Sequence, residues 1–233
     1  MTDHFKNIYA NKADLYDRMV AREDQHGNLF SALNEIHDLA GATAVDLGAG
    51  TGRVTRLLSF QVAQVIGFDM APAMLAVARE QLELTGMDNW ALAVAQNEAI
   101  PLANDSVDVV VEGWSFGHAV GWYPDDWRDR IGAMLSEMAR VVRPGGTLIL
   151  LETLGTGRKS PEPPTEGLAE LYAWWEGEQG FQHRWIRTDY QFESVAEADE
   201  LTRFFFGDDL ADSLVEKNQV LLPECTGIWW KQV

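Results

Sequence analysis

Three glycines at alternate positions follow a short apolar run, and they constrain the fold of this chain more than any other feature. Residues 44–52 read AVDLGAGTG, with Asp46 two positions before Gly48. Such glycines remove the Cβ atoms that keep a ligand off the main chain and permit unusual backbone angles. The next residues, RVTRLL, have helical spacing, so the loop opens on a helix N-terminus whose free amides attract polar atoms. The pattern predicts a strand, a nucleotide-binding loop and a helix, although by itself it also fits a tight turn.

Strand-like and helical patterns alternate after this loop. A continuous β-branched run, VDVVVEG, is typical of a strand buried on both faces of a parallel sheet. Helices are expected from Pro72 to Gly86 and from about Trp127 to Val142, where an R-P-G-G turn follows. Further strands are expected at 64–70, 90–95, 107–113 and 147–153. Five strand–helix units in series predict an α/β fold with a doubly wound parallel sheet.

The segments on either side of this alternation have a different character. Two helical stretches are expected within residues 5–40, a Gly/Pro-rich connection and a helix cover 155–180, and Ser194 is a candidate cap for a late helix between two late strands. We predict a single domain, 1–233, made of N-terminal helices (1–40), a core (41–154), a covering insertion (155–180) and sheet-completing strands and helices (181–233).

Composition excludes several classes of function. The 233 residues suffice for one sizeable domain, and the net charge of −18 would repel phosphate backbones and anionic membranes, so neither nucleic acid nor a membrane is an expected partner. No long apolar span or secretory signal is evident, which predicts a cytoplasmic location. The lone Cys225 excludes an internal disulfide, and no residue cluster predicts a metal site.

The glycine spacing narrows the choice of nucleotide. Dinucleotide dehydrogenases use G-x-G-x-x-G, whereas Gly48, Gly50 and Gly52 bring the third glycine one residue earlier. This G-x-G-x-G form with a preceding acid resembles motif I of the class I S-adenosylmethionine (SAM) methyltransferases. Three later segments resemble that family in the same order, namely FDMAPAML, EAIPLANDSVDVVVEGWSFGHA and LSEMARVVRPGGTLILLET.

Within the class, the chain is most similar to small-molecule methyltransferases of the ubiquinone and menaquinone biosynthesis type. The resemblance covers roughly residues 40–155. It implies a Rossmann-like sheet of seven strands, the last antiparallel, with an N-terminal helical segment and a helical cover. It also implies SAM as cofactor and a small-molecule methyl acceptor.

The resemblance assigns a set of cofactor-binding residues. In the loop these are Asp46, Gly48, Ala49, Gly50, Thr51 and Gly52. Asp69 ends the second strand, where a carboxylate can accept the ribose hydroxyls or, alternatively, cap the next helix. Met70 would pack on adenine or belong to the core.

Five further cofactor contacts are expected, most of them with an alternative left open. Gln96 stands where relatives usually have Asp, and its carbonyl can still accept from the adenine amino group. Asn97 and Glu98 either contact the cofactor or face solvent, and Glu112 ends the fourth strand. Tyr16, like Tyr9, matches an aromatic position that closes over the cofactor, although a core role is the alternative.

The acceptor is expected after the fourth strand. His118 is a candidate base, with a structural histidine as the alternative. The expected pocket walls, besides His118 itself, are Trp114, Phe116, Trp122 and Tyr123. The tryptophans of the cover, including Trp174, Trp175 and Trp185, fit either an apolar pocket or core packing.

The sequence therefore predicts transfer of a methyl group from SAM to an unidentified small molecule, with release of S-adenosylhomocysteine (SAH). Two alternatives remain open: a SAM-binding protein without turnover, and a nicotinamide-dependent oxidoreductase. The expected state is a monomer or a homodimer.

Overall fold

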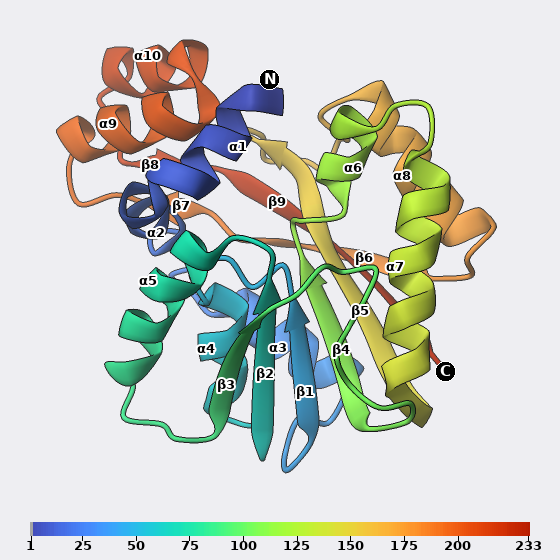
Figure 1. Cartoon of the computed structure of the whole chain (residues 1–233). Helices are drawn as coiled ribbons and strands as arrows, with labels where there is room; N and C mark the ends of the chain where they lie inside the picture. The colour runs from blue at the N-terminus through green and yellow to red at the C-terminus, as the bar shows by residue number, and fades with distance from the viewer. Residues whose placement is uncertain (1) are drawn as a thin grey trace.

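The computed structural model describes residues 2–233, which form a large seven-stranded sheet with helices on both faces (Figure 1). Its strands are β1 (Thr43–Leu47), β2 (Gln64–Asp69), β3 (Trp90–Val94), β4 (Val107–Gly113), β5 (Val142–Thr156), β6 (Gln182–Arg187) and β9 (Glu224–Gln232). They lie in the order β3-β2-β1-β4-β5-β9-β6. Neighbours are parallel except at β9, which is antiparallel to both β5 and β6. The predicted doubly wound sheet with a reversed last strand is confirmed.

The strand order reverses between β1 and β4. The chain winds outward from β1 through β2 to β3, then returns to β4 on the other side of β1 and continues to β5. In open α/β sheets, ligands bind at such a switch point, outside the carboxyl ends of the strands. The glycine loop after β1 and the residues after β4 therefore flank the expected site.

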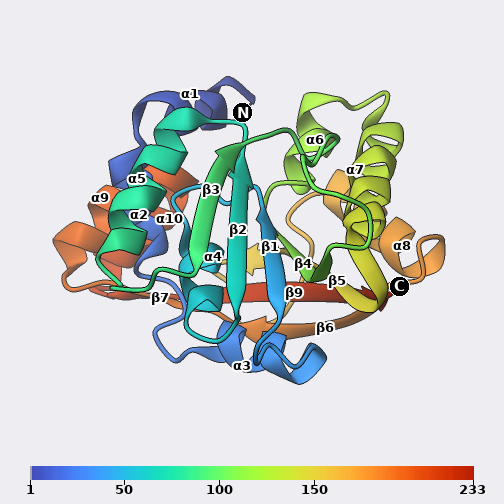
Figure 2. The same cartoon turned by 60° about the horizontal axis from the view of Figure 1, so that its bottom comes forward.

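Helices cover the two faces of the sheet with separate apolar clusters. On one face, α3 (Asn28–Ile36) and α4 (Arg53–Ser59) pack on β-strand residues such as Val109 and Ile149. On the other face, α6 (Gly117–Trp122), α7 (Trp127–Val141) and α8 (Glu166–Gly177) pack on residues such as Val110 and Leu150. Alternate residues of β4 and β5 thus enter different clusters, as a strand buried on both faces requires. Figure 2 shows α7 and α8 beside each other at one end of the sheet.

The N-terminal region contains three helices where two were predicted. These are α1 (Thr2–Asn11), α2 (Ala13–Val20) and α3, with α5 (Pro72–Glu83) packed against the first two. Lys12 separates α1 from α2, and left-handed backbone at Asp24 and Gly27 separates α2 from α3. The apolar spacing continues through the break at Lys12, which is why the sequence pattern did not show it.

The R-P-G-G segment differs from its prediction as a turn before a strand that starts at residue 147. Here β5 begins at Val142, directly after α7. Val107 of β4 pairs with Val142 and Val109 pairs with Thr147, so residues 143–146 are accommodated as an irregularity in the ladder. Gly145 has a φ of 85°, and its amide donates to Val233 O at 2.6 Å. The segment therefore bulges out of the strand rather than preceding it.

The C-terminal region follows its predicted order, with additional short elements. Ser194 precedes α9 (Val195–Phe206), and its hydroxyl accepts a hydrogen bond from the Glu197 amide at 3.1 Å, as predicted. The sequence pattern missed α10 (Asp208–Glu216), α6 and β8 (Leu221–Leu222). The first late strand, expected over the run FQHRWIRTDYQF, is divided into β6 and the short β7 (Tyr190–Gln191), which pairs with β8 in a separate sheet. In Figure 1, α9 and α10 lie near α1, on the side of the sheet toward which β1, β2 and β4 point.

The tryptophan-rich α8 packs against the sheet. Trp175 and Trp229 are completely buried, and their ring centroids are 5.3 Å apart. Trp174 is buried edge-on against Trp127, whereas Trp185 is 42% exposed. Core packing is therefore the role of Trp174 and Trp175, and Cys225 is buried in the same cluster. Among residues 2–233, no helix is long and apolar enough to cross a membrane.

Replacing Ser194 by Ala tests the late helix cap. The variant loses the hydrogen bond to the Glu197 amide. We therefore expect the free energy of unfolding, measured in urea, to be about 1 kcal/mol lower than that of the wild type. Ser136→Ala is the matched control, because its exposed hydroxyl only bonds back to Gly132 O within α7 and its loss leaves no capping donor unpaired. Equal stability of the two variants would show that the Ser194 cap does not stabilise α9.

Candidate functional site

Left-handed backbone shapes the glycine loop. Gly48, Gly50 and Gly52 have φ values of 67°, 56° and 83°. A Cβ on Gly48 would lie 2.5 Å from Ser115 Cβ, and one on Gly52 would lie 3.0 Å from Ala78 Cβ of α5. Glycine is thus required at both positions for conformation and for close approach. The loop is pressed against the residues that follow β4 on one side and against α5 on the other.

The other loop residues are held from below. The Ala49 amide donates to Phe68 O at 2.9 Å, and the Thr51 side chain is buried. Asp46 is also buried, and its Oδ2 accepts from Thr55 Oγ1 at 2.6 Å. Burial raises the pKa of Asp46 to about 7. Asp46 therefore ties β1 to α4 under the loop, so any effect on a ligand passes through the loop.

Asp69 joins β2 to the glycine loop. Its Oδ2 accepts from the Gly50 amide at 2.8 Å, and its Oδ1 accepts from the Ala71 amide at 2.7 Å, just before α5. Burial raises the pKa of this carboxyl. The N-cap residue of α5 is Ala71, and no side chain caps the helix, so Asp69 fixes the chain before the helix and the predicted capping role is wrong. Met70 is 65% exposed and so is not a core residue.

The loop after β3 contributes one link to the site. Gln96 is exposed, while Asn97 and Glu98 are partly buried. The Asn97 amide nitrogen lies 3.3 Å from Ser115 Oγ. Asn97 is therefore brought to the residues beside the glycine loop, whereas Gln96 and Glu98 make no side-chain contact with them among the described hydrogen bonds.

Two buried carboxyls hold the turn after β4. Glu112 Oε1 accepts from the amides of Ser115 and Phe116, at 2.6 and 2.9 Å, and from Ser115 Oγ at 2.8 Å. Glu152 of β5 accepts from the Gly117 amide at 2.7 Å. Sequence reasoning missed Glu152 and Ser115. The available signal was an acid directly after the apolar run LILL, which burial makes costly unless the acid has a role.

His118 lies under α1. Its Nε2 is 2.8 Å from the Tyr9 hydroxyl, and its ring stacks on Trp122 with centroids 4.9 Å apart. Burial lowers the pKa of His118 to about 4, so the imidazole is neutral at pH 7. Phe5 also contacts His118, and Tyr16 packs edge-on against Tyr9. The structure thus brings the two predicted tyrosines together, with Tyr9 on the candidate base.

The structure separates the predicted pocket walls. Trp122 lies with His118, but Trp114 has left-handed backbone (φ 56°) and packs on the opposite apolar cluster, with Arg53 stacked on its ring at 4.5 Å. Phe116 is completely buried in the core, and Tyr123 is exposed beside Arg130. Of the five predicted wall residues, only His118 and Trp122 therefore contact each other.

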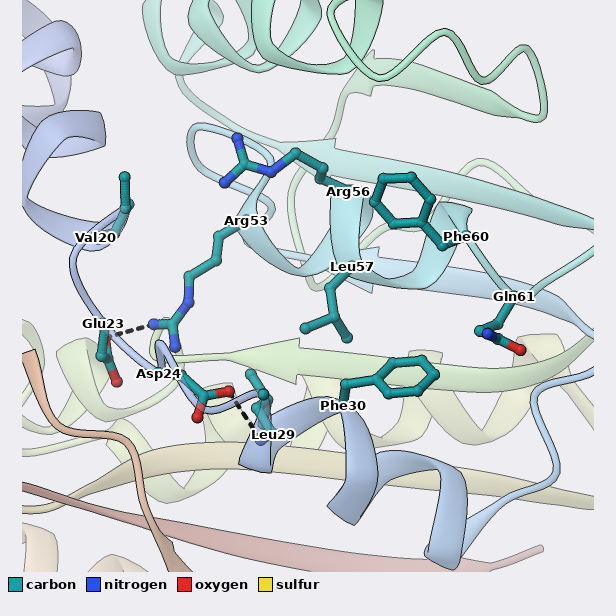
Figure 3. Close-up of a pocket in the computed structure, with 12 residues that line it drawn as sticks. Val20, Glu23, Asp24, Leu29, Phe30, Arg53, Arg56, Leu57, Phe60 and Gln61 are labelled. Atoms are coloured by element: carbon teal, nitrogen blue, oxygen red, sulfur yellow. Dashed lines mark hydrogen bonds and ion pairs between the residues drawn. The ribbon is translucent and has the colours of Figure 1, made fainter.

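A cavity of about 440 Å³ lies elsewhere, between the α2–α3 connection and the outer face of α4 (Figure 3). Arg53, Leu57 and Phe60 line it from α4, and Glu23 pairs with Arg53 at 2.5 Å. None of the predicted cofactor or acceptor residues lines this cavity. It is distinct from the site at the switch point.

Carboxyls without a basic partner characterise the switch point. Asp46, Asp69, Glu112 and Glu152 lie in the carboxyl-terminal parts of β1, β2, β4 and β5, and no ion pair of the described residues includes any of them. Such a site suits a ligand with positive charge, whose binding favours the ionised carboxylates, and offers no basic side chain to a pyrophosphate. Within residues 2–233, no group of acidic, histidine or cysteine side chains is arranged to hold a metal ion.

Comparisons with known proteins agree with this geometry. A family profile described as a methyltransferase domain matches residues 45–150. A malonyl-[acyl-carrier protein] O-methyltransferase of Methylococcus capsulatus is 34% identical over 172 residues, which cover 72% of this chain and 54% of the relative. A demethylmenaquinone methyltransferase of Shouchella clausii is 30% identical over 154 residues, 65% of this chain and 61% of the relative. The chain thus spans between half and two thirds of these relatives.

Solved structures show the same fold. A SAM-dependent methyltransferase from Aquifex aeolicus superposes with a TM-score of 0.57 at 19% identity, covering 90% of this chain and 95% of that one. The YcgJ protein from Bacillus subtilis superposes with a TM-score of 0.57 at 16% identity, covering 89% of this chain and all of that one.

Gly52→Ala tests the packing of the loop on α5. Left-handed backbone alone costs roughly 1–2 kcal/mol, and the contact with Ala78 should add roughly 1–3 kcal/mol of overpacking. Gly86→Ala is the control, since Gly86 has a similar φ of 71° but open space around its Cβ position. Urea unfolding should show the larger loss for Gly52→Ala, and equal losses would contradict the contact.

The buried carboxyls predict how stability depends on pH. Burial raises the pKa of Glu112 to about 8 and that of Glu152 to about 7, from an ordinary 4.5. The folded protein therefore binds more protons than the unfolded chain above that ordinary value, and stability falls as pH rises toward 8. We expect a higher melting temperature at about pH 6 than at about pH 8.5 for the ligand-free protein.

Glu112→Gln should reduce this pH dependence, while Glu83→Gln, on the exposed side of α5, should keep the wild-type slope. Scanning calorimetry across this pH range measures both. If the melting temperature of Glu112→Gln depends on pH as steeply as that of Glu83→Gln and of the wild type, Glu112 ionises at its ordinary pKa.

Proposed function

The chain belongs to the class I SAM-dependent methyltransferases, and from this we propose that it transfers the methyl group of SAM to a small-molecule acceptor and releases SAH. The observation that carries the proposal is the set of four carboxyls at the switch point, none of which has a basic partner. SAM supplies an electrophilic methyl group on a positively charged sulfonium. A pyrophosphate would instead meet carboxyls and no basic side chain here, which disfavours the nicotinamide-dependent alternative.

The proposed cofactor residues fall into two groups. Residues 48–52 form the surface on which SAM lies. Asp69 accepts hydrogen bonds from the ribose hydroxyls of SAM, using the carboxylate lone pairs that the Gly50 and Ala71 amides do not occupy. The exposed Met70 supports an apolar contact with the adenine face. Asp46 fixes the loop from below, and Glu112 holds Ser115 beside the loop. The roles of Tyr16, Gln96, Asn97 and Glu98 stay predictions from the resemblance.

On the acceptor side, the protein's task is to position the acceptor and to exclude water. His118 and Trp122 form the part of the predicted pocket that comes together, and α1 closes over them through Tyr9. A hydroxyl or amine of the acceptor would take the place of the Tyr9 hydroxyl at His118 Nε2. Admission of an acceptor therefore requires α1 to move.

The substrate, the single-domain division, the cytoplasmic location and the oligomeric state stay predictions. By their names, the two relatives described above act on malonyl-[acyl-carrier protein] and on demethylmenaquinone. The chain covers only part of each relative. Measuring SAH release across a metabolite panel identifies the acceptor and separates an enzyme from a SAM-binding protein without turnover.

A thermal-shift comparison tests the cofactor. SAM and SAH should each raise the melting temperature, because a ligand that binds only the folded state stabilises it. NADH should have no effect. Stabilisation by NADH alone would overturn the proposal.

Asp69→Asn tests the ribose contact. The variant keeps the shape of the side chain and loses the charge that accepts from the ribose hydroxyls, so SAM should bind roughly 10- to 100-fold more weakly. Asp88→Asn is the control and should bind SAM normally, because Asp88 is exposed in the α5–β3 connection, at the amino end of the strands. Calorimetric titration gives both dissociation constants, and unchanged binding by Asp69→Asn would exclude Asp69 from the site.

A further inference from the structure

Glu112 and Glu152 form a pair on one face of the sheet. Glu112 is paired in register with Leu150, and Glu152 is two residues further along β5, so both side chains project to the same side. Glu112 has no exposed surface, and Glu152 is 4% exposed. Both carboxyls bind the same short turn, Ser115 to Gly117, from below.

One oxygen of this pair has no partner. Glu112 Oε1 accepts three hydrogen bonds, whereas the buried Oε2 accepts none. A buried carboxylate oxygen without a donor is costly, and protonation removes that cost. The arrangement therefore favours one proton held between the two carboxyls.

The groups around the pair supply no positive charge at neutral pH. The titratable side chains that the covering helices bring near the pair are Tyr9 of α1, His118 of α6 and Tyr172 of α8. Helix α7 turns apolar residues toward this core. Across the sheet, the acidic side chains of β1, β2 and β9 (Asp46, Asp69 and Glu224) supply no positive charge either. Burial raises the pKa of both glutamates, and the charge of Glu152 raises that of Glu112 further.

The pair lies one residue layer from the proposed cofactor surface. Ser115, which Glu112 holds by two bonds, lies against Gly48 of the glycine loop. A positive charge on that loop would therefore act on the pair across a short, poorly solvated distance, where electrostatic coupling is strong. SAM carries a net positive charge, and SAH has lost the sulfonium charge.

We propose that Glu112 and Glu152 share a proton that leaves when SAM binds and that the pair takes up a proton again when methyl transfer removes the sulfonium charge. This inference rests on the proposed function and adds to it a proton equilibrium that the charge of the bound cofactor controls.

The step balances for an acceptor with an O–H or N–H group. The acceptor lone pair forms the new bond to the methyl carbon, and the carbon–sulfur bond breaks with its electron pair going to sulfur. The acceptor releases its proton to solvent, and the Glu112–Glu152 pair takes up one proton from solvent, because the proton affinity of the pair rises when the neighbouring positive charge disappears. Binding of the next SAM expels that proton to solvent.

Calorimetric titration in buffers of different ionisation enthalpy tests the inference without an acceptor. At about pH 7.5, SAM binding to the wild-type protein should release up to about one proton, whereas SAH binding should release much less. Affinity for SAM should accordingly rise with pH more steeply than affinity for SAH. Equal proton release with the two ligands would overturn the inference and leave the proposed function intact, whereas failure of both ligands to bind would overturn the proposed function.

Glu112→Gln and Glu152→Gln separate the pair from other carboxyls. Each variant should lose most of the SAM-specific proton release, and Glu83→Gln should keep it. Binding of SAH reports whether a variant still has a folded site. Unchanged proton release in both folded variants would assign the proton to Asp46 or Asp69 and contradict the inference. If a variant does not fold, the wild-type comparison of SAM with SAH decides the question.

Discussion

The contact between Gly48 and Ser115 is the point on which the rest of the site depends. It joins the loop after β1 to the turn after β4 where the strand order reverses, with only 2.5 Å between a Gly48 Cβ position and the Ser115 side chain. Any other residue at position 48 would separate the two segments. Two buried carboxyls fix Ser115 and its neighbours from below, and the same turn carries His118 toward α1. Cofactor loop, acceptor side and helical cover are thus positioned through one contact.

Charge distinguishes this switch point from those that bind dinucleotides. The four acids at the strand ends have no basic partner, although the chain carries thirteen arginines elsewhere. Desolvation and mutual repulsion make such a cluster unfavourable for the free protein, and a cationic ligand relieves that cost. Selection of the cofactor and the protonation state of the buried glutamates therefore follow from the same feature.

The sequence was sufficient where local patterns decide structure and insufficient where distant residues meet. Periodicity and the glycine spacing predicted β1, the loop, α4 and the strand that Asp69 ends, because each depends on neighbours in the chain. The partnership of Glu152 with Gly117 and that of Tyr9 with His118 depend on contacts across the fold, which no spacing encodes. Trp114 was grouped with Trp122 by proximity in sequence, but its left-handed backbone turns it to the opposite face. The missed α6 is too short for a helical period to show.

A crystal structure of the protein with bound SAH would show where the cofactor lies. We expect SAH on residues 48–52, with its ribose at Asp69 and its sulfur toward the Ser115–His118 turn above Glu112 and Glu152. SAH bound in the cavity beside α4, or bound with its sulfur directed away from that turn, would contradict this expectation.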